Sequence, residues 1–404
     1  MKKKIVAIVI VIILISSTGG YLLFSNHEEE SSNHNEESSN QNGRYWDDDY
    51  FSPIRQSGMF LKGDVDNDGD IDLTTLNTVT SEIITFLNNG VGEYNEVLNS
   101  SGVYCNDIKF GYLNNDNFLD IATAGDYILI NNGDGSFTKK YMQLVDRTPE
   151  VIIVDDFNRD GYDDLVTKCR AGSDQYVRLH YNDGKGDFKN YSKKIFVFLG
   201  NDITEGESAD VNQDMKPDAI LNYGNLISIQ INDENNDFVE DIIGYDKFGC
   251  HKLKFLNLVD LNNDNYIDIF VICGSQYGAA KDAFIYVSYN NGTYPLPEVE
   301  KIEFGNYTSG FREISDIVFF DYNKDNYIDF VFANESWINI YCYKNQSVYC
   351  KELQKNINGQ DILALNADDL NNDGLSDIAV LQEDRLIILK RQEHGNFVST
   401  EFRY

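Results

Sequence analysis

The sequence DVDNDGDID, at residues 64–72, is the clearest of seven copies of one nine-residue pattern. The other copies are YLNNDNFLD (112–120), DFNRDGYDD (156–164), DVNQDMKPD (210–218), DLNNDNYID (260–268), DYNKDNYID (321–329) and DLNNDGLSD (369–377). The copies start 44 to 61 residues apart, and 305 residues over six intervals give a mean step of about 51. A repeat of this period predicts an array of similar structural units, each supplying one such loop.

The loops carry oxygen-bearing side chains at positions 1, 3, 5 and 9, which is the kind of donor set that Ca²⁺ prefers. No His or Cys occurs inside any copy, so a transition metal fits less well. The candidate metal ligands are Asp64, Asp66, Asp68, Asp70 and Asp72; Asn114, Asp116 and Asp120; Asp156, Asn158, Asp160 and Asp164; Asp210, Asn212, Asp214 and Asp218; Asp260, Asn262, Asp264 and Asp268; Asp321, Asn323, Asp325 and Asp329; and Asp369, Asn371, Asp373 and Asp377.

Position 6 of the loop must allow a sharp bend, which favours a residue that tolerates a positive φ. Six copies have Gly or Asn there, whereas the fourth has Met215 followed by Pro217, which makes its turn less certain. The second copy begins with Tyr112 instead of a carboxylate. We therefore expect about six competent Ca²⁺ sites and one weak or empty site.

Two other interpretations of the loops were weighed. Asp, Asn and Gly also form ordinary turns without a metal, but seven aligned copies favour metal binding. An EF-hand loop needs a Glu at position 12 and a helix on each side. Position 12 in the clearer copies is Thr75, Thr167, Val271 or Val380, never Glu. The flanking runs IDLTTLN, IDIFVIC and IDFVFAN are typical of β-strands, so the EF-hand is excluded.

Each repeat contains four short apolar runs separated by tight turns, and none shows helical periodicity. This pattern predicts an all-β fold, a seven-bladed β-propeller of four-stranded antiparallel blades. A β-solenoid is the second choice, but its repeats are normally shorter. One domain is expected over residues 44–404, because no blade can bury both of its faces alone. The strand order places all the predicted Ca²⁺ loops on one face and leaves the other face for a ligand.

These segments, GDVDNDGDIDL with ITFLNNGVGEY and DLNNDGLSDIAVL above all, resemble the FG-GAP/VCBS repeat family. That family is found in integrin α-subunit propellers and in many bacterial and archaeal surface proteins, and certain fungal lectins are similar. The resemblance covers roughly residues 55–404. It implies a propeller with Ca²⁺ in these loops and ligand recognition on the opposite face.

The amino terminus predicts a membrane-spanning or signal helix over residues 1–24. Three lysines precede an uncharged stretch at 5–24, whose 20 residues would extend about 30 Å as a helix. A retained anchor would leave the carboxyl-terminal domain outside the cell, in a single-pass cell-surface protein. The alternative is a cleaved signal peptide and a secreted protein, although no A-x-A site is present. Residues 25–43 are an acidic, low-complexity stretch that predicts a disordered linker.

The six cysteines agree with export. Cys342 and Cys350 flank a predicted hairpin turn, and Cys250 and Cys273 fall on neighbouring predicted strands, so each pair is placed to form a disulfide. Cys105 and Cys169 remain outside these pairs. Buried thiols without any disulfide are the alternative.

Composition and motifs narrow the function. The formal charge of −33 disfavours binding to a phosphate backbone, so no nucleic-acid partner is expected. No G-x-S-x-G, H-E-x-x-H, P-loop or dinucleotide motif occurs, so we expect no enzyme. The leading hypothesis is adhesion to, or recognition of, an extracellular protein or glycan. The alternatives are a secreted lectin-like protein, a carbohydrate-active enzyme and a structural surface-layer component. The ligand-face candidates are Arg170 and Tyr277, in the long predicted loops 169–175 and 274–282, and Trp337.

Overall fold

The computed structural model describes residues 59–403, except for 78–79, 106, 143, 145–149, 172–173, 189–191, 199–202, 234–236, 244–251, 275–282, 293–294, 297–298, 303–313, 346 and 394. All of them belong to one compact unit, Ser52–Tyr404. The predicted anchor (1–24) and linker (25–43) lie outside the described residues. In the part of the chain that is described, no helix has the length and apolar character needed to span a membrane.

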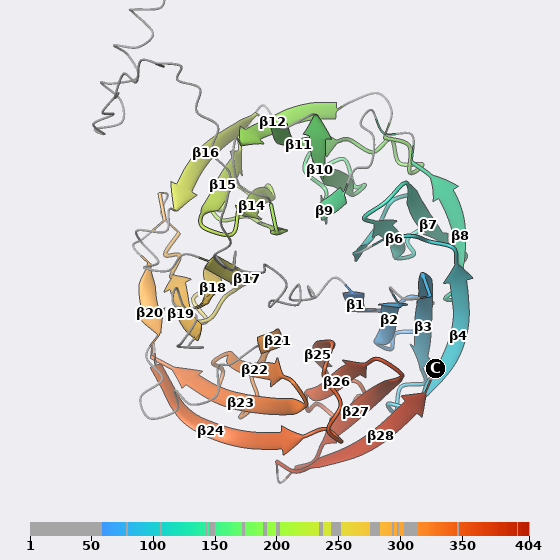
Figure 1. Ribbon diagram of the computed structural model, residues 1–404, viewed down its shortest axis with the longest axis vertical. Helices are drawn as coiled ribbons and strands as arrows, with labels where there is room; N and C mark the ends of the chain where they lie inside the picture. Colours follow the sequence, from blue (N-terminus) through green and yellow to red (C-terminus); the bar gives the residue numbers. More distant parts are fainter. Residues whose placement is uncertain are drawn as a thin grey trace, which may run out of the picture. The chain divides into compact units, whose positions relative to one another are not determined.

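The described residues form 28 strands arranged in seven four-stranded antiparallel sheets, which confirms the predicted propeller. Figure 1 shows the sheets as blades around a central axis, with the first strand of each innermost and the fourth at the rim. We number the blades in chain order and call their strands A to D from the axis outward. The strands of blades 1 to 3 are β1 (Phe60–Gly63), β2 (Asp72–Asn77), β3 (Glu82–Asn88) and β4 (Tyr94–Ser101); β5 (Ile108–Gly111), β6 (Asp120–Thr123), β7 (Tyr127–Asn131) and β8 (Phe137–Tyr141); and β9 (Glu150–Asp155), β10 (Asp164–Ala171), β11 (Asp174–His180) and β12 (Ser192–Phe198). Those of blades 4 to 7 are β13 (Glu205–Ala209), β14 (Asp218–Asn222), β15 (Ile227–Asn232) and β16 (Phe238–Ile243); β17 (Lys252–Val259), β18 (Asp268–Gly274), β19 (Ala283–Ser288) and β20 (Glu300–Ile302); β21 (Ile314–Phe320), β22 (Asp329–Asn334), β23 (Trp337–Lys344) and β24 (Ser347–Asn356); and β25 (Ala364–Asp368), β26 (Asp377–Gln382), β27 (Arg385–Arg391) and β28 (Phe397–Arg403).

The hydrophobic core lies between the blades. Each of the seven clusters of buried side chains joins two neighbouring blades, as Phe270 of blade 5 and Phe330 of blade 6 do. The B strands are therefore covered on both faces, and β2, β14 and β26 are buried along almost their whole length. This explains why β14 and β26 are almost continuously apolar after their first residue, whereas the outer strand β28 mixes half-buried and exposed residues.

The ring closes between blades 7 and 1 without any exchange of strands, because every sheet is built from four consecutive strands. Side chains make the closure. Lys62 Nζ lies 2.6 Å from the Ala367 carbonyl oxygen and 2.7 Å from Asp368 Oδ2, and Asn366 Nδ2 donates to the Phe60 carbonyl at 2.9 Å. A shared hydrophobic cluster packs beneath these contacts.

The A–B loops and the C–D turns lie on one face of the ring, which we call the loop face. The C–D glycines Gly133 and Gly184 sit against Phe118 and Tyr162 of the A–B loops in their own blades. The B–C turns and D–A connections meet on the other side, the opposite face. There the Ile357 N–H donates to the Ser336 carbonyl at 2.7 Å. The structure thus places the A–B loops and the described B–C turns on different faces, and Trp337 follows directly after one of those B–C turns.

One predicted loop is wrong. Residues 169–175 were expected to form a long B–C loop, but β10 and β11 stay paired as far as Ala171 and Asp174, with only 172–173 between them. The backbone groups of these residues bond within the sheet ladder, so the polar residues lie on paired strands. The other predicted loop falls at 275–282, outside the described residues.

Four of the six cysteines have described side chains. Cys273 and Cys342 are both in disulfide bonds. Cys342 lies directly opposite Cys350 in the β23–β24 ladder, whereas Cys250 lies outside the described residues. Cys105 and Cys169 keep their thiols. Burial raises the pKa of the Cys105 thiol to about 12, so this thiol is a poor nucleophile at neutral pH.

Candidate functional site: seven acidic loops on one face

Six of the seven A–B loops share one hydrogen-bond frame around the aspartate at position 1. We number the loops 1 to 7 with their blades. In loop 1 the N–H groups of Asp68 and Gly69, at positions 5 and 6, donate to the two carboxylate oxygens of Asp64 at 3.1 and 3.0 Å. The same pair of bonds recurs at the position-1 residues Asp156, Asp210, Asp260, Asp321 and Asp369. The position-1 carboxylate therefore closes the loop on itself.

The backbone of the loops bends as the sequence predicts. Position 6 has a positive φ in all seven loops, including Met215 at 68° in loop 4, so that turn forms despite its residue. Position 4 has a positive φ as well in six of them, a feature that the sequence analysis missed. These residues are Asn67, Arg159, Gln213, Asn263, Lys324 and Asn372.

The closing aspartate at position 9 ties each loop to strand C of its own blade. In blade 1, Oδ1 of Asp72 accepts the Asn88 N–H at 2.8 Å and Oδ2 accepts the Val65 N–H at 2.8 Å. All seven closing aspartates are fully buried, and all accept an N–H from strand C. They are Asp72, Asp120, Asp164, Asp218, Asp268, Asp329 and Asp377.

Burial raises the pKa of every closing aspartate well above that of an exposed carboxyl group. The pKa rises to about 7 for Asp72, with the neighbouring charges of Asp66 and Asp68 adding to the effect of burial. It rises to about 8 for Asp164 and to about 6 for Asp120. A nearby cation would lower these values, because it favours the ionised form.

The donor geometry fits a Ca²⁺ ion. In loop 1, oxygens of Asp64, Asp66 and Asp72 all lie within 4.8 Å of one another. Two ligands of one Ca²⁺ stand at most about 5 Å apart, since each Ca–O distance is roughly 2.3–2.6 Å. A carboxylate oxygen that accepts one N–H still has a lone pair for a metal. In loops 3 and 7, moreover, the buried Oδ2 of Asp164 and that of Asp377 make no hydrogen bond of normal geometry.

Loop 2 departs from this frame, as the sequence predicts. Tyr112 is 47% exposed and offers no carboxylate, while its N–H donates to Asp163 Oδ2 of blade 3 at 2.7 Å. Asn115, at position 4, is the only residue at that position without a positive φ. Asn114, Asp116 and Asp120 remain in place. Loop 2 nevertheless lacks both the position-1 carboxylate and the positive φ at position 4 that the other six loops share.

Sequence analysis missed the asparagine that ends strand C. Asn131 Nδ2 donates to the carbonyl of Leu119 in its own loop at 3.0 Å and to that of Val65, at position 2 of loop 1, at 2.8 Å. Asparagines in five blades thus reach position 2 of the preceding loop: Asn88, Asn131, Asn182, Asn232 and Asn290. The available signal was the recurring N-N-G or N-D-G after the third run of each repeat.

The ligand-face candidates are only partly described. Trp337 begins β23 at the B–C turn on the opposite face and is 36% exposed. Arg170 lies in β10 at the same end of blade 3, but its side chain is outside the described part, and so is Tyr277 as a whole. Of these three candidates, only Trp337 therefore has a described side chain.

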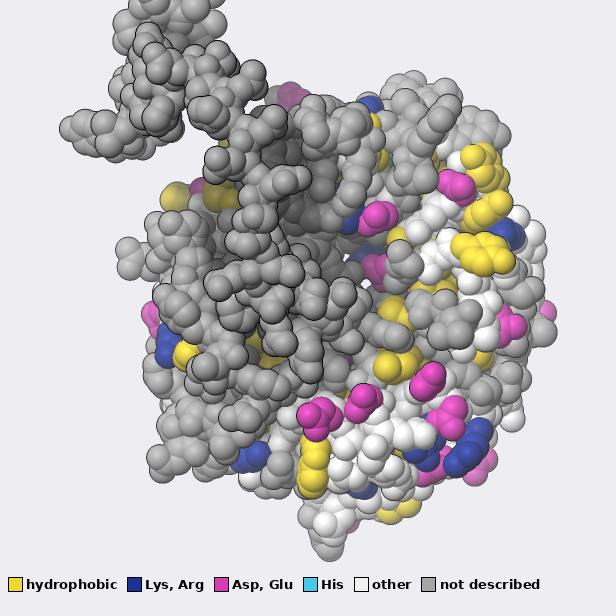
Figure 2. Space-filling model, viewed as in Figure 1, with side chains coloured by type: hydrophobic (Ala, Val, Ile, Leu, Met, Phe, Trp, Pro, Cys, Tyr) yellow, Lys and Arg dark blue, Asp and Glu magenta, His cyan; other side chains and the backbone are white. Residues whose placement is uncertain are grey.

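Charges are mixed on the described surface. In the view of Figure 2, coloured Lys and Arg side chains lie beside Asp and Glu side chains near the carboxyl end of β28. One such pair joins strands β27 and β28, where Arg385 Nη1 lies 3.2 Å from Glu401 Oε2.

Comparison with known proteins identifies the repeat. The FG-GAP-like repeat family matches residues 156–221 and 260–332, which contain loops 3 to 6. The protein is a seven-bladed β-propeller that carries FG-GAP-like repeats. No curated protein sequence matches the chain.

Solved structures share the architecture at low sequence identity. One is an Agrocybe aegerita lectin described by its specific recognition of non-reducing terminal N-acetylglucosamine. It is 16% identical, with 85% of this chain and 94% of the lectin covered and a TM-score of 0.57. BBS1N in complex with ARL6DN is 10% identical (86% and 92% covered, TM-score 0.49), and a Lactobacillus plantarum protein is 13% identical (73% and 82%, 0.46). At these identities the likeness extends to the fold alone.

Proposed function

We propose that the protein is a calcium-binding, cell-surface β-propeller that recognises an extracellular protein or glycan. Ca²⁺ ions in loops 1 and 3 to 7 would neutralise the acidic loop face. The ligand would bind the opposite face, and the amino-terminal segment would anchor the protein in the membrane. A secreted form without the anchor is the alternative.

The observation that carries the calcium proposal is the frame shared by six loops. In each, the chain itself holds the carboxylates at positions 1 and 9 in place. The loop therefore presents fixed oxygen donors to a cation, as the 4.8 Å cluster of Asp64, Asp66 and Asp72 does. A pre-formed set of hard oxygens favours binding of a divalent cation.

Calcium titration and chelation test this part. We expect about six ions per chain at saturation. At a free Ca²⁺ concentration 100 times Kd, one site stabilises the fold by about 2.7 kcal/mol, so six sites would contribute about 16 kcal/mol. For a domain of roughly 345 residues, with an unfolding entropy near 0.7 kcal/mol/K, chelation should lower Tm by about 20 °C. An unchanged Tm after exhaustive chelation would refute the proposal.

The opposite face is the proposed ligand-binding surface, because it lies away from the acidic loops. Among the described residues of that face, Trp337 offers a partly exposed ring, a group suited to stacking on a sugar. The fold is shared with a lectin that recognises N-acetylglucosamine, which makes glycans the first class to test.

A glycan array with the full chain, with and without Ca²⁺, distinguishes the lectin-like function from adhesion to a protein and from a structural role. Calcium-dependent binding that Trp337→Ala abolishes supports a lectin-like function. The matched control is Tyr141→Ala, which removes an exposed aromatic side chain from the outer strand of blade 2. A silent array together with a captured extracellular protein supports adhesion. If the chain binds neither a glycan nor a protein, the structural surface-layer role remains.

A further inference from the structure

Loop 6 has a basic neighbour at a position where the other blades have none. In blade 6, the Tyr343 N–H donates to the closing aspartate, Asp329, and the next residue is Lys344. The corresponding residues are neutral or acidic elsewhere: Asn89, Asn132, Asp183, Asp233, Asn291 and Gln392.

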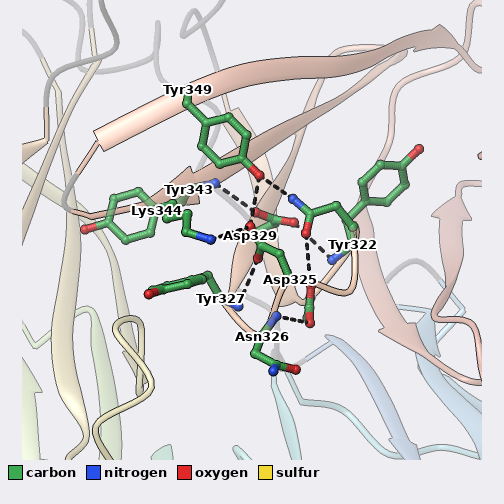
Figure 3. A network of polar contacts seen from close by, with 10 residues as sticks. Tyr322, Asp325, Asn326, Tyr327, Asp329, Tyr343, Lys344 and Tyr349 are labelled. Atoms are coloured by element: carbon green, nitrogen blue, oxygen red, sulfur yellow. Dashed lines mark hydrogen bonds and ion pairs between the residues drawn. The ribbon is translucent and has the colours of Figure 1, made fainter.

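Two side chains from the C–D hairpin of blade 6 reach into this loop, as Figure 3 shows. Lys344 Nζ lies 3.4 Å from Oδ2 of Asp325, at position 5, and the Tyr349 hydroxyl donates to the same oxygen at 3.2 Å. The Tyr349 oxygen also accepts a hydrogen bond from Nδ2 of Asn323, at position 3. Two of the four side chains that would hold Ca²⁺ in loop 6 are therefore already engaged by the protein.

The hairpin holds these two groups in place. Lys344 Nζ lies over the ring of Tyr327, at position 7 of the loop, 4.3 Å from its centre. A cation over an aromatic face is favourable, which fixes the ammonium beside the loop. Tyr349 neighbours Cys350 in β24, which pairs in the ladder with Cys342 of β23, and a disulfide at Cys342 constrains β23 at this point.

We propose that Lys344 is the built-in cation of loop 6 and that Tyr349 closes the loop over Asp325 and Asn323. This inference rests on the proposed calcium function and ranks its sites. A Ca²⁺ ion entering loop 6 must displace the ammonium from Asp325 and break the Tyr349 bonds, whereas in loop 1 the Asp64, Asp66 and Asp72 oxygens face one another directly. Loop 6 consequently keeps its shape without a divalent cation and binds Ca²⁺ at least tenfold more weakly than loops 1, 3, 4, 5 and 7.

Calcium counting by equilibrium dialysis on the full chain tests the inference. We expect five tight sites in the wild-type protein and six in Lys344→Gln. The matched control is Lys324→Gln, which removes a positive charge from an exposed position of the same loop and should leave five. Tyr349→Phe removes both hydrogen bonds while keeping the ring, and should strengthen the sixth site by a smaller factor than Lys344→Gln.

Asp325→Ala assigns the gained site to loop 6. It should leave five tight sites in the wild-type background and reduce Lys344→Gln from six to five, with thermal melts of each variant showing that it is folded. Six equal sites in the wild-type chain, or a gain in Lys344→Gln no greater than in Lys324→Gln, would overturn the inference. A chain that binds no Ca²⁺ in any variant would instead overturn the proposed calcium function, and this inference with it.

Discussion

The asparagine that joins neighbouring blades gives the sharpest prediction about stability. Asn131 is 3% exposed and makes three side-chain hydrogen bonds. Its Nδ2 donates to the carbonyls of Val65 and Leu119, and its Oδ1 accepts the Gly133 N–H at 2.8 Å. Asn131→Ala removes all three bonds at once and leaves their buried backbone partners without this side chain.

The expected loss follows from these contacts. A buried hydrogen bond contributes about 1 kcal/mol net, so three contribute about 3 kcal/mol. With an unfolding entropy of about 0.7 kcal/mol/K for roughly 345 residues, Tm should fall by about 4 °C. Asn131→Asp should be worse, because one carboxylate oxygen would then face two carbonyl oxygens at the same distances.

Thermal unfolding in saturating Ca²⁺ is the assay, since Asn131 is not among the predicted metal ligands. Asn132→Ala is the matched control: its hydrogen bonds to Ser136 and Thr138 are exposed, and the change should alter Tm by less than about 1 °C. If Asn131→Ala costs no more than Asn132→Ala, the asparagine does not hold the blades together and the reasoning fails.

Three further predictions follow from single positions. Met215→Asn should raise stability by about 1 kcal/mol, because Met215 has a φ of 68° and is 71% exposed, so strain is relieved without loss of packing; a lower Tm would contradict this. Tyr112→Asp should add one bound Ca²⁺ per chain by supplying the missing position-1 carboxylate, and an unchanged count in equilibrium dialysis would show that loop 2 lacks more than this group. Burial raises the pKa of Asp316 to about 7, so the folded state keeps a proton that the unfolded state loses above about pH 4. Asp316 therefore destabilises the fold progressively from about pH 4 to pH 7, by up to about 4 kcal/mol. The Tm of the wild type minus the Tm of Asp316→Asn should therefore fall from about pH 4 to pH 7. A difference that stays constant over that range would refute the pKa shift.

The blade number and the loop positions were predictable because the loop sequence is a local signal. Asp64 to Asp72 places a bend and several carboxylates within nine residues, and seven repeats of it fix the number of blades. The lapse of loop 2 was predictable for the same reason, since Tyr112 lacks the acceptor that the turn needs.

Contacts between blades were not predictable from one repeat. Asn131 and Val65 are 66 residues apart, and nothing in either local sequence indicates that a side-chain amide of one blade meets a backbone carbonyl of the next. The engagement of Asp325 by Tyr349 was hidden likewise, because it depends on how far the β24 strand extends over loop 6. At residues 169–175, the polar composition indicated a loop, but the ladder between β10 and β11 outweighs that local tendency.

Blade 6 departs from the common plan at several positions, and these departures compensate for one another. At its strand-C position, Tyr343 replaces the asparagine that in five other blades bonds the preceding loop, and its hydroxyl instead hydrogen-bonds to that of Tyr289 in blade 5. A disulfide at Cys342 and the Lys344–Asp325 pair add constraints that do not depend on a metal. Strand β23, which runs from Trp337 on the opposite face to Lys344 on the loop face, is thus held at its loop end by the protein's own groups. If the proposed ligand binds at Trp337, blade 6 would keep this side chain in place when Ca²⁺ is scarce, whereas the neighbouring blades would loosen.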